Sequence, residues 1–262
     1  MVRALLAAAF IAALAAMAVL PGARSSAAGP ILVCIDPGHG GSPGAVNGTL
    51  READINLDVS LALAARLDLS GIDSTLTRTD DSTKSARDRY EFCNDARADL
   101  FVGVHTNSVA DSTIDGSLTI YFHNDDKVLA RDLQDAMLAR LAPTSPKPAS
   151  FINFGLKKDA LGVILKTDMP GAVVEPVFMS NTEEATRLAQ TVAECSDPEN
   201  PQCRRAQIVE ALFYGVTAYL AAQPVPTATD TPGGPTPTPT PTPDDGGGPP
   251  SCPPGHARRG LC

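Results

Sequence analysis

The chain has 262 residues, of which 43% are hydrophobic and 19% are charged, a composition that supports a folded domain and excludes a wholly disordered chain. Its formal net charge is -9 and its isoelectric point is near 4.9. These values exclude binding of nucleic acid or of an anionic membrane through bulk positive charge. Twelve of the 23 prolines follow Gln223, so the totals average over two different kinds of chain.

The first 28 residues have the composition of an export signal. A basic start at Arg3 is followed by an apolar run over 4–20 and by a small-residue stretch over 25–28. These are the three parts of a secretory signal peptide, so we assign residues 1–28 to one. The alternative is an uncleaved membrane anchor, although about 17 apolar residues lie at the short limit for a bilayer span. We expect an exported chain with no membrane span after signal removal.

The C-terminal region is a spacer followed by a short tail. Residues 224–250 contain alternating Thr-Pro pairs and added glycines, which favour an extended chain without a regular ladder of backbone hydrogen bonds. Residues 251–262 are bounded by Cys252 and Cys262 and are too few to hold a core. Residues 29–223 therefore form the one sizeable folded domain, which we expect to be monomeric.

The six cysteines favour disulfides, because the chain is predicted to be exported. Cys195 and Cys203 flank a turn-rich polar insert and are the first predicted pair, and the two tail cysteines are the second. Cys34 lies in an apolar strand and Cys93 in a helical stretch. We interpret each of these two as a small buried apolar residue, and a mutual bridge stays open as the alternative.

The folded domain alternates short apolar strands with amphipathic helices. This alternation predicts an α/β fold with three layers, in which a mostly parallel twisted sheet carries helices on both faces. Functional groups in such folds gather in loops beyond the carboxyl ends of the strands. The predicted strands cover 31–35, 74–79, 100–105, 118–122 and 172–178, and the predicted helices cover 85–97, 127–141, 182–190, 204–222 and the segment with Ile55, Val59, Leu63 and Leu67 on one face.

Two histidines follow directly after predicted strands. His39 lies in Asp-Pro-Gly-His-Gly-Gly after the first strand, where glycines on both sides leave room for a ligand or substrate. His105 ends the apolar strand Phe-Val-Gly-Val. A surface turn that happens to contain histidine is the alternative for His39. Because both side chains occupy the same structural position, we interpret them as parts of one site.

Two carboxylates complete the candidate site. Glu52 opens the first amphipathic helix, where the helix dipole alone is an alternative reason for an acidic residue. Glu175 lies inside the apolar strand Ala-Val-Val-Glu-Pro-Val-Phe, and a lone buried carboxylate is costly unless it is paired or functional. Pro176 marks the end of regular pairing there, so we expect Glu175 near a strand terminus or edge.

The chemistry of these four residues favours amide hydrolysis. Two histidines and one carboxylate leave one tetrahedral position open, as in a catalytic zinc site with a bound water. We predict that His39, Glu52 and His105 bind one Zn²⁺ and that Glu175 is the base that takes a proton from the attacking water. The spacing matches no short metal motif, so the ligands must come from separate elements.

Five motifs together resemble the zinc-dependent N-acetylmuramoyl-L-alanine amidases of the type 3 amidase family. They are DPGHGG, READINL, TRTDD with the following SAR, FVGVHTN, and AVVEPVFMSN, in the family's order from about residue 31 to 220. The resemblance implies that residues 29–223 are a catalytic domain acting on peptidoglycan, at the amide between N-acetylmuramic acid and L-alanine of the stem peptide. It also implies a secreted location, in the cell wall or periplasm, and the same roles for His39, Glu52, His105 and Glu175.

Some positions depart from the family pattern or have open roles. Family members often carry Asn-Arg-Gly before the fourth motif, whereas this chain has Asn153-Phe154-Gly155, and no long insertion that would form an autoinhibitory helix follows His105. We expect Asp36 and Asn107 either to orient the two histidines or to serve in turns. The family pattern also predicts a structural charge network of Arg78, Asp80 and Arg87, while His123 and His256 have no predicted partner.

Two other functions remain open from the sequence. One is a different zinc peptidase acting on stem peptides, although no motif offers a cationic pocket for a terminal carboxylate. The other is a non-catalytic wall-binding module. The reactive side chains at all four candidate positions argue against this second alternative. The first would release a different product from peptidoglycan than an amidase does, and the second would release none.

Overall fold

The structure, a computed structural model, describes residues 30–223. The predicted signal peptide, the spacer, and the tail with its predicted Cys252–Cys262 pair lie outside these residues. Within the described range no helix combines the length and the apolar character needed to cross a membrane.

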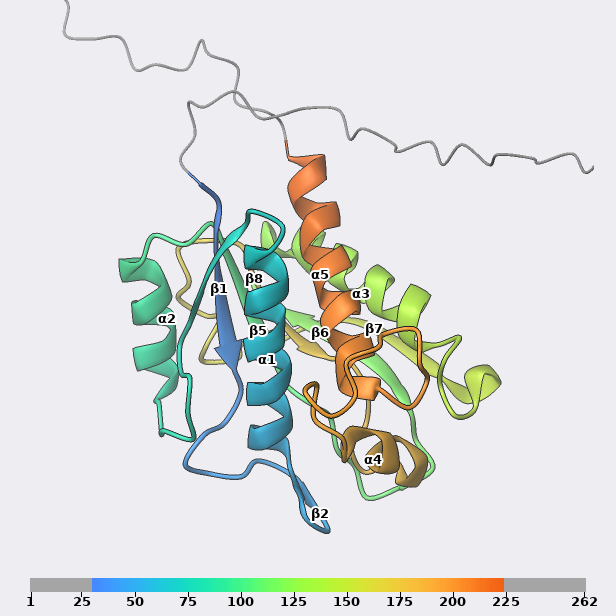
Figure 1. The fold of residues 1–262 in the computed structure, drawn as a ribbon. Coiled ribbons are helices and arrows are strands. Elements are labelled where there is room, and N and C mark those ends of the chain that lie inside the picture. The colour runs from blue at the N-terminus through green and yellow to red at the C-terminus, as the bar shows by residue number, and fades with distance from the viewer. Residues whose placement is uncertain (1–29, 224–262) are drawn as a thin grey trace, which may run out of the picture. The chain divides into compact units, whose positions relative to one another are not determined.

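A six-stranded sheet forms the centre of the domain (Figure 1). Its strand order is β4-β1-β5-β8-β6-β7, and every neighbouring pair is parallel except β6 with β8. The predicted mostly parallel sheet is therefore confirmed. The central strands are buried along nearly their whole length, as their uninterrupted apolar sequences require. The strands are β1 (Leu32–Pro37), β4 (Asp73–Leu76), β5 (Leu100–Val104), β6 (Gly116–Tyr121), β7 (Ile152–Lys158) and β8 (Gly171–Glu175).

Helices cover both faces of this sheet, which confirms the three-layer prediction (Figure 1). The larger core lies under three long helices whose apolar stripes face the sheet, for example Ile55, Val59 and Leu63. The smaller core, on the other face, includes Cys93 and Phe101. The helices over the larger core are α1 (Glu52–Asp68), α3 (Asp126–Leu141) and α5 (Arg204–Ala222), the opposite face carries α2 (Ala86–Asp95), and the short α4 (Thr182–Leu188) precedes α5.

The sequence missed the edge strand β7 and a small hairpin. The hairpin consists of β2 (Val46–Asn47) and β3 (Leu50–Arg51), each too short to show a period. A 3-10 helix at Pro148–Ser150 leads into β7, and the pairing of β7 with β6 shifts by one residue near Gly155. This bulge interrupts the alternation of side chains from which a strand is recognised.

Both pairs of cysteines in the described range are disulfides. Cys195 and Cys203 are bonded, as predicted. Cys34 on β1 is bonded to Cys93 on α2, which is the alternative that the sequence left open, and both residues are also fully buried. The second bond therefore ties the central sheet to the one helix on its smaller-core face.

A buried ion pair fixes the start of α5. Arg204 and Glu184 are fully buried and their side chains are paired through two hydrogen bonds. Arg204 also donates to the carbonyl oxygen of Leu141 at the end of α3. One fully buried guanidinium thus joins three helices.

We predict that Glu184→Ala lowers the free energy of unfolding by about 3–5 kcal/mol, because Arg204 would stay buried without its carboxylate. Urea unfolding of the full chain, followed by far-UV circular dichroism, measures this. The matched control is Glu183→Ala, the neighbouring residue, whose exposed ion pair with Lys147 should contribute little. Equal effects of the two substitutions would contradict the prediction.

Candidate metal centre

Three neighbouring strands bring three of the predicted site residues to one edge of the sheet. β1, β5 and β8 are adjacent and parallel. His39 follows the end of β1 by two residues, His105 follows β5 directly, and Glu175 is the last residue of β8. Carboxyl ends of parallel strands meet at one edge, so these side chains, 136 positions apart in sequence at the extremes, reach one place.

The fourth residue is placed by the start of α1. The Glu52 backbone N–H donates to the carbonyl oxygen of Ala45 at 3.0 Å, and that of Ala53 donates to Pro43 at 2.9 Å. In return the Ala45 N–H donates to Glu52 Oε2 at 2.9 Å. The loop after β1 thus satisfies backbone donors that a helix leaves free at its first turn. The same contacts aim the Glu52 carboxylate toward the histidines.

Glu52 lies between the two histidines. Its Oε2 atom is 3.0 Å from His39 Nε2, and its Oε1 atom is 3.0 Å from His105 Nδ1. One possible ligand atom from each residue lies within 4.8 Å of the others. Ligands about 2.0–2.1 Å from a tetrahedral zinc ion are about 3.3 Å apart, so the donor types and spacing fit such an ion. The three residues form a group that can hold a metal ion.

Two glycines leave the room that these side chains occupy. A Cβ atom at Gly38 would overlap the His105 ring. A Cβ atom at Gly44 would lie 2.6 Å from Glu52 Oε2 and 2.6 Å from His39 Cδ2, and Gly44 has a φ of +69°. The loop can therefore wrap around the cluster only where side chains are absent.

The two carboxylates have pKa values shifted in opposite directions. For Glu52, burial acts to raise the pKa, but hydrogen bonds with His105 and His39 lower it well below the ordinary range. For Glu175, burial raises the pKa to about 7, against a smaller lowering by the His105 charge. Glu52 is thus held as an anion suited to bind a cation, while Glu175 is suited to exchange a proton near neutral pH.

Glu175 has an atom that the protein itself leaves unsatisfied. Its Oε2 is buried and has no hydrogen-bond partner among the described residues. A buried carboxylate oxygen without a partner is costly, and a water molecule or a substrate group would satisfy it. His105 is influenced by the same carboxylate: burial acts to lower its pKa, but the hydrogen bond to Glu52 and the Glu175 charge raise it.

Residues 33–195 match the model of a family described as N-acetylmuramoyl-L-alanine amidase, which covers more than half of the chain. The chain belongs to this family. The family prediction from the five sequence motifs is therefore confirmed.

Individual relatives agree with this assignment. The amidase LytC of Bacillus subtilis (strain 168) is 33% identical over 165 residues, which cover 61% of this chain and 32% of LytC, so the chain spans about a third of that protein. A germination-specific amidase of the same organism is 28% identical over 178 residues, 61% of this chain and 71% of the relative. The structure of amidase AmiC2 of Nostoc punctiforme superposes with a TM-score of 0.62 at 31% identity, covering 74% of this chain and 98% of AmiC2.

Other predicted residues lie near the site but do not all contact it. The Asn107 side chain accepts a hydrogen bond from the Ser108 N–H. Asp36 reaches His39 only through Arg89, which pairs with Asp36 and donates to the His39 carbonyl oxygen. Arg87 is exposed and paired with Glu91, so Arg89, rather than Arg87, belongs to the charge network of this family member. His123 is an exposed surface residue.

Sequence reasoning missed the residues behind Glu52 and the role of Arg89. Asn56 Nδ2 donates to Glu52 Oε1 at 3.4 Å, and Asn56 Oδ1 accepts a hydrogen bond from Thr106 Oγ1 at 2.9 Å. Both residues are buried. Asn56 follows Glu52 by one helical turn, and Arg89 precedes the buried Cys93 by one turn. Helical spacing from a known buried residue was therefore the available signal.

The segment in which this chain departs from the family's Asn-Arg-Gly pattern lies in β7, at the exposed edge of the sheet. Asn153, Phe154 and Gly155 form the bulged part of β7, and Leu118 of β6 lies between Gly155 and Glu175 in the register. The Phe154 ring is 5.3 Å from the Phe178 ring. The residues from Thr106 to Asp115, between His105 and β6, contain no helix, as expected.

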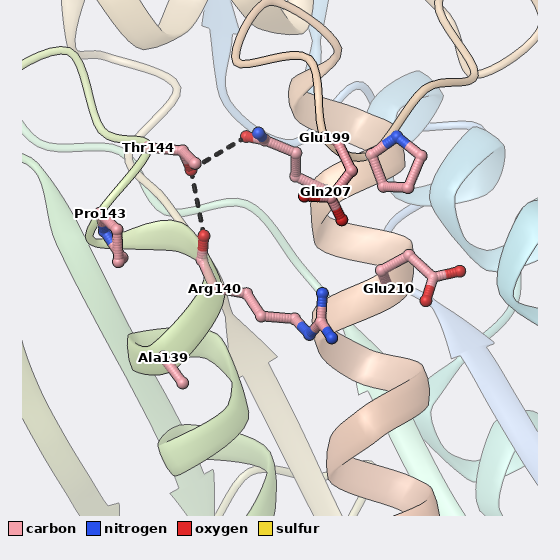
Figure 2. Close-up of a pocket in the computed structure, with 8 residues that line it drawn as sticks. Ala139, Arg140, Pro143, Thr144, Glu199, Gln207 and Glu210 are labelled. Atoms are coloured by element: carbon pink, nitrogen blue, oxygen red, sulfur yellow. Dashed lines mark hydrogen bonds between the residues drawn. The ribbon is translucent and has the colours of Figure 1, made fainter. Parts of the chain in front are cut away.

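A cavity of about 360 Å³ lies elsewhere, between α3, α5 and the loop closed by Cys195 and Cys203 (Figure 2). Thr144 Oγ1 in its wall donates to the Arg140 carbonyl oxygen at 3.0 Å. Its Glu210 is paired with Arg66. None of the four candidate residues lines it, so we place the functional site at the histidine cluster. The lining residues are Ala139, Arg140, Pro143, Thr144, Pro198, Glu199, Gln207 and Glu210.

We predict that Gly44→Ala lowers the affinity for a divalent metal, measured with Zn²⁺, by at least about tenfold, because the new methyl group displaces two ligand side chains. Competition against a zinc-binding dye gives the affinity. Gly48→Ala is the matched control, since Gly48 also has a positive φ of +60° but has open space around its missing Cβ. Loss of affinity in both variants would attribute the effect to backbone strain instead.

We also predict a pH dependence of stability that belongs to Glu175. Its pKa of about 7 in the folded chain exceeds the ordinary value of 4.5. The folded state therefore keeps the proton, and the resulting stabilisation is complete below pH 4.5 and is lost as the pH rises through about 7. The difference in free energy of unfolding between metal-free wild type and Glu175→Gln should fall by about 3 kcal/mol over this interval.

Urea unfolding at a series of pH values measures this difference. Glu183→Gln, in an exposed ion pair, is the control and should follow the wild type. A constant difference between wild type and Glu175→Gln would show that Glu175 titrates normally.

Proposed function

We propose that the chain is an exported zinc-dependent N-acetylmuramoyl-L-alanine amidase. It hydrolyses the amide between the lactyl group of N-acetylmuramic acid and the L-alanine of the stem peptide in peptidoglycan, during remodelling or lysis of cell walls. The observation that carries this proposal is the buried Glu175 Oε2, which has no hydrogen-bond partner within residues 30–223 and lies at the same sheet edge as the His39, Glu52 and His105 group. Family membership supports the substrate.

His39, Glu52 and His105 would hold the zinc ion, with their nitrogen and oxygen atoms as ligands. When bound, zinc polarises a carbonyl oxygen and lowers the pKa of a water molecule toward about 7. Glu52 remains anionic at neutral pH, because its hydrogen bonds to the two histidines outweigh the effect of its burial on the pKa. Of the three residues, Glu52 would thus bring the negative charge to a bound cation.

Glu175 performs the proton transfer. Its carboxylate takes a proton from the water as the water oxygen attacks the amide carbon. The same carboxyl group then gives the proton to the nitrogen of the L-alanine, and the carbon–nitrogen bond breaks. One water is consumed, and the products are a free lactyl carboxylate and a stem peptide with a free amino end. A raised pKa suits both halves of this cycle, since the group must gain and lose a proton.

The proposed location is the cell wall or periplasm. The sequence over 1–28 supports export, and the two disulfides of residues 30–223 suit an oxidising compartment. The net charge of -9 supports recognition of the polymer through site geometry instead of long-range attraction. We propose that the chain acts as a monomer.

Incubation of the purified full chain with purified peptidoglycan tests the proposal. We expect release of stem peptides with a free L-alanine amino group, detected by amino-group labelling and mass spectrometry. A chelator should abolish the release and added Zn²⁺ should restore it. Release of reducing sugars, cleavage only inside the stem peptide, or activity in the chelator would each contradict the proposed function.

Two substitutions separate metal binding from proton transfer. Glu175→Ala should lower kcat by about 10²–10⁴-fold while zinc stays bound, because the substitution removes only the carboxyl group that acts first as base and then as acid. His39→Ala should lose both zinc and activity. A Glu175→Ala protein with normal turnover would remove Glu175 from the mechanism, and binding to peptidoglycan without turnover in the wild type would favour a wall-binding module.

A further inference from the structure

The loop that carries His39 has an unusual backbone held by two buried arginines. His39 has a φ of 63°, a left-handed conformation that residues other than glycine seldom adopt. The carbonyl oxygens of Pro37, Gly38 and His39 all accept hydrogen bonds from guanidinium groups. The backbone conformation that aims the His39 ring at Glu52 is therefore stabilised by hydrogen bonds to three consecutive carbonyl oxygens.

The two arginines are nearly inaccessible to water, and together they donate to three consecutive carbonyl oxygens of the loop. Arg78 is 3% exposed and donates to Pro37 and Gly38 at 2.8 and 2.7 Å. Arg89 is 5% exposed, donates to Pro37 at 2.8 Å, and also donates to the carbonyl oxygen of His39. Of these two arginines, Arg89 is the one that donates to the backbone of the candidate metal ligand His39.

A buried carboxylate on β1 balances the charge of Arg89. Asp36 forms the one buried carboxylate pair of Arg89, at 2.7 Å. The other guanidinium hydrogen bonds go partly to the loop carbonyl oxygens and partly outside the loop, where Arg89 donates to Lys84 and Arg78 donates to Asp80 and Ala53. Charge-assisted hydrogen bonds of this kind are stronger than those between neutral groups, and a guanidinium buried without them would be costly. Movement of the loop away from the arginines would break these hydrogen bonds and leave buried guanidinium N–H groups without partners.

α2 carries Arg89 in register with a disulfide. Arg89 and Cys93 are four residues apart on the helix, about 6 Å along its axis. Asp36 and Cys34, their partners on β1, are two residues apart, about 6.7 Å along the strand. The Cys34–Cys93 bond and the Asp36–Arg89 ion pair thus connect the same face of α2 to β1 at two successive levels. The disulfide therefore fixes the position of α2 along β1 and the rotation of α2 about its axis, and both determine where Arg89 contacts the loop.

We propose that Arg89, held in register by the Cys34–Cys93 disulfide, is a positioning residue for the metal ligand His39. It acts through the His39 backbone and through Asp36, and it contacts neither the metal nor the substrate. The inference rests on the proposed zinc site and extends it to α2, none of whose residues is a ligand. Substitution of residues that orient a metal ligand typically costs 10–100-fold in metal affinity.

The test measures zinc affinity of the full chain by dye competition and, independently, the visible absorption spectrum of the Co²⁺-substituted protein, which reports ligand geometry. The double variant Arg89→Gln/Asp36→Asn removes both members of the ion pair, so neither of the two charges is left without the other. It should bind Zn²⁺ 10–100-fold more weakly and show an altered Co²⁺ spectrum. Arg89→Lys should recover part of the affinity, because an ammonium group keeps the charge but cannot form the planar fork.

Two controls distinguish positioning from loss of stability. Arg87→Gln, on the exposed side of α2, should leave affinity and spectrum unchanged. Val216→Ala, fully buried in α5 in the core on the other face of the sheet, should lower the melting temperature without changing the zinc affinity of the folded protein. Zinc affinity of the Arg89 variants within twofold of wild type would overturn the proposal, as would an equal loss in Val216→Ala.

The disulfide is tested by substitution, because reduced thiols would themselves bind zinc. Cys34→Ala/Cys93→Ala should weaken zinc binding in the same direction as the Arg89 variants, whereas Cys195→Ala/Cys203→Ala should not. Normal affinity in the first pair would overturn the part assigned to the disulfide. Because the readout is binding, a wild type that binds zinc but leaves peptidoglycan intact would overturn the proposed function alone.

Discussion

The adjacency of β1, β5 and β8 is the constraint on which the candidate site depends. Parallel strands end at the same edge, so one backbone arrangement delivers His39, His105 and Glu175 to a single place. The fourth residue follows from it, because the chain leaving β1 must turn before α1 and fastens Glu52 as it does so. A change in strand order would separate the ligands even if every one of these residues were kept.

The two carboxylates show how one small region holds opposite electrostatic environments. Glu52 has donors on every side: two histidines, the Ala45 amide and, more weakly, Asn56. The His105 charge also acts on Glu175, but Glu175 ends an apolar strand, and its Oε2 has no hydrogen-bond donor among residues 30–223. The difference in hydrogen-bond donors, not in residue type, separates a group that binds a cation from a group that transfers a proton.

The sequence predicted the layer order, most helices and the four candidate residues, because these depend on local periodicity and on positions after strands. The helix at 204–222 was predicted with the bounds that the structure shows, since its apolar stripe is uninterrupted. β7 was missed, because Gly155 breaks its alternation and an edge strand needs no apolar face. Arg89 was missed for another reason: its helical spacing from Cys93 indicates only a buried position, whereas its role depends on the His39 carbonyl oxygen, which lies 50 residues away in the sequence.

The burial of the Cys34–Cys93 bond determines when the oxidation state of this cysteine pair can change. Both sulfur-bearing residues are fully buried between β1 and α2, so a soluble reductant cannot reach the bond unless the helix first lifts from the sheet. Thiol–disulfide exchange requires access of the attacking thiolate. The oxidation state of this pair is therefore set while the chain folds and is retained afterwards. The oxidation state of the pair therefore reflects the redox conditions of the compartment in which the chain folded, whatever the redox conditions around the protein later.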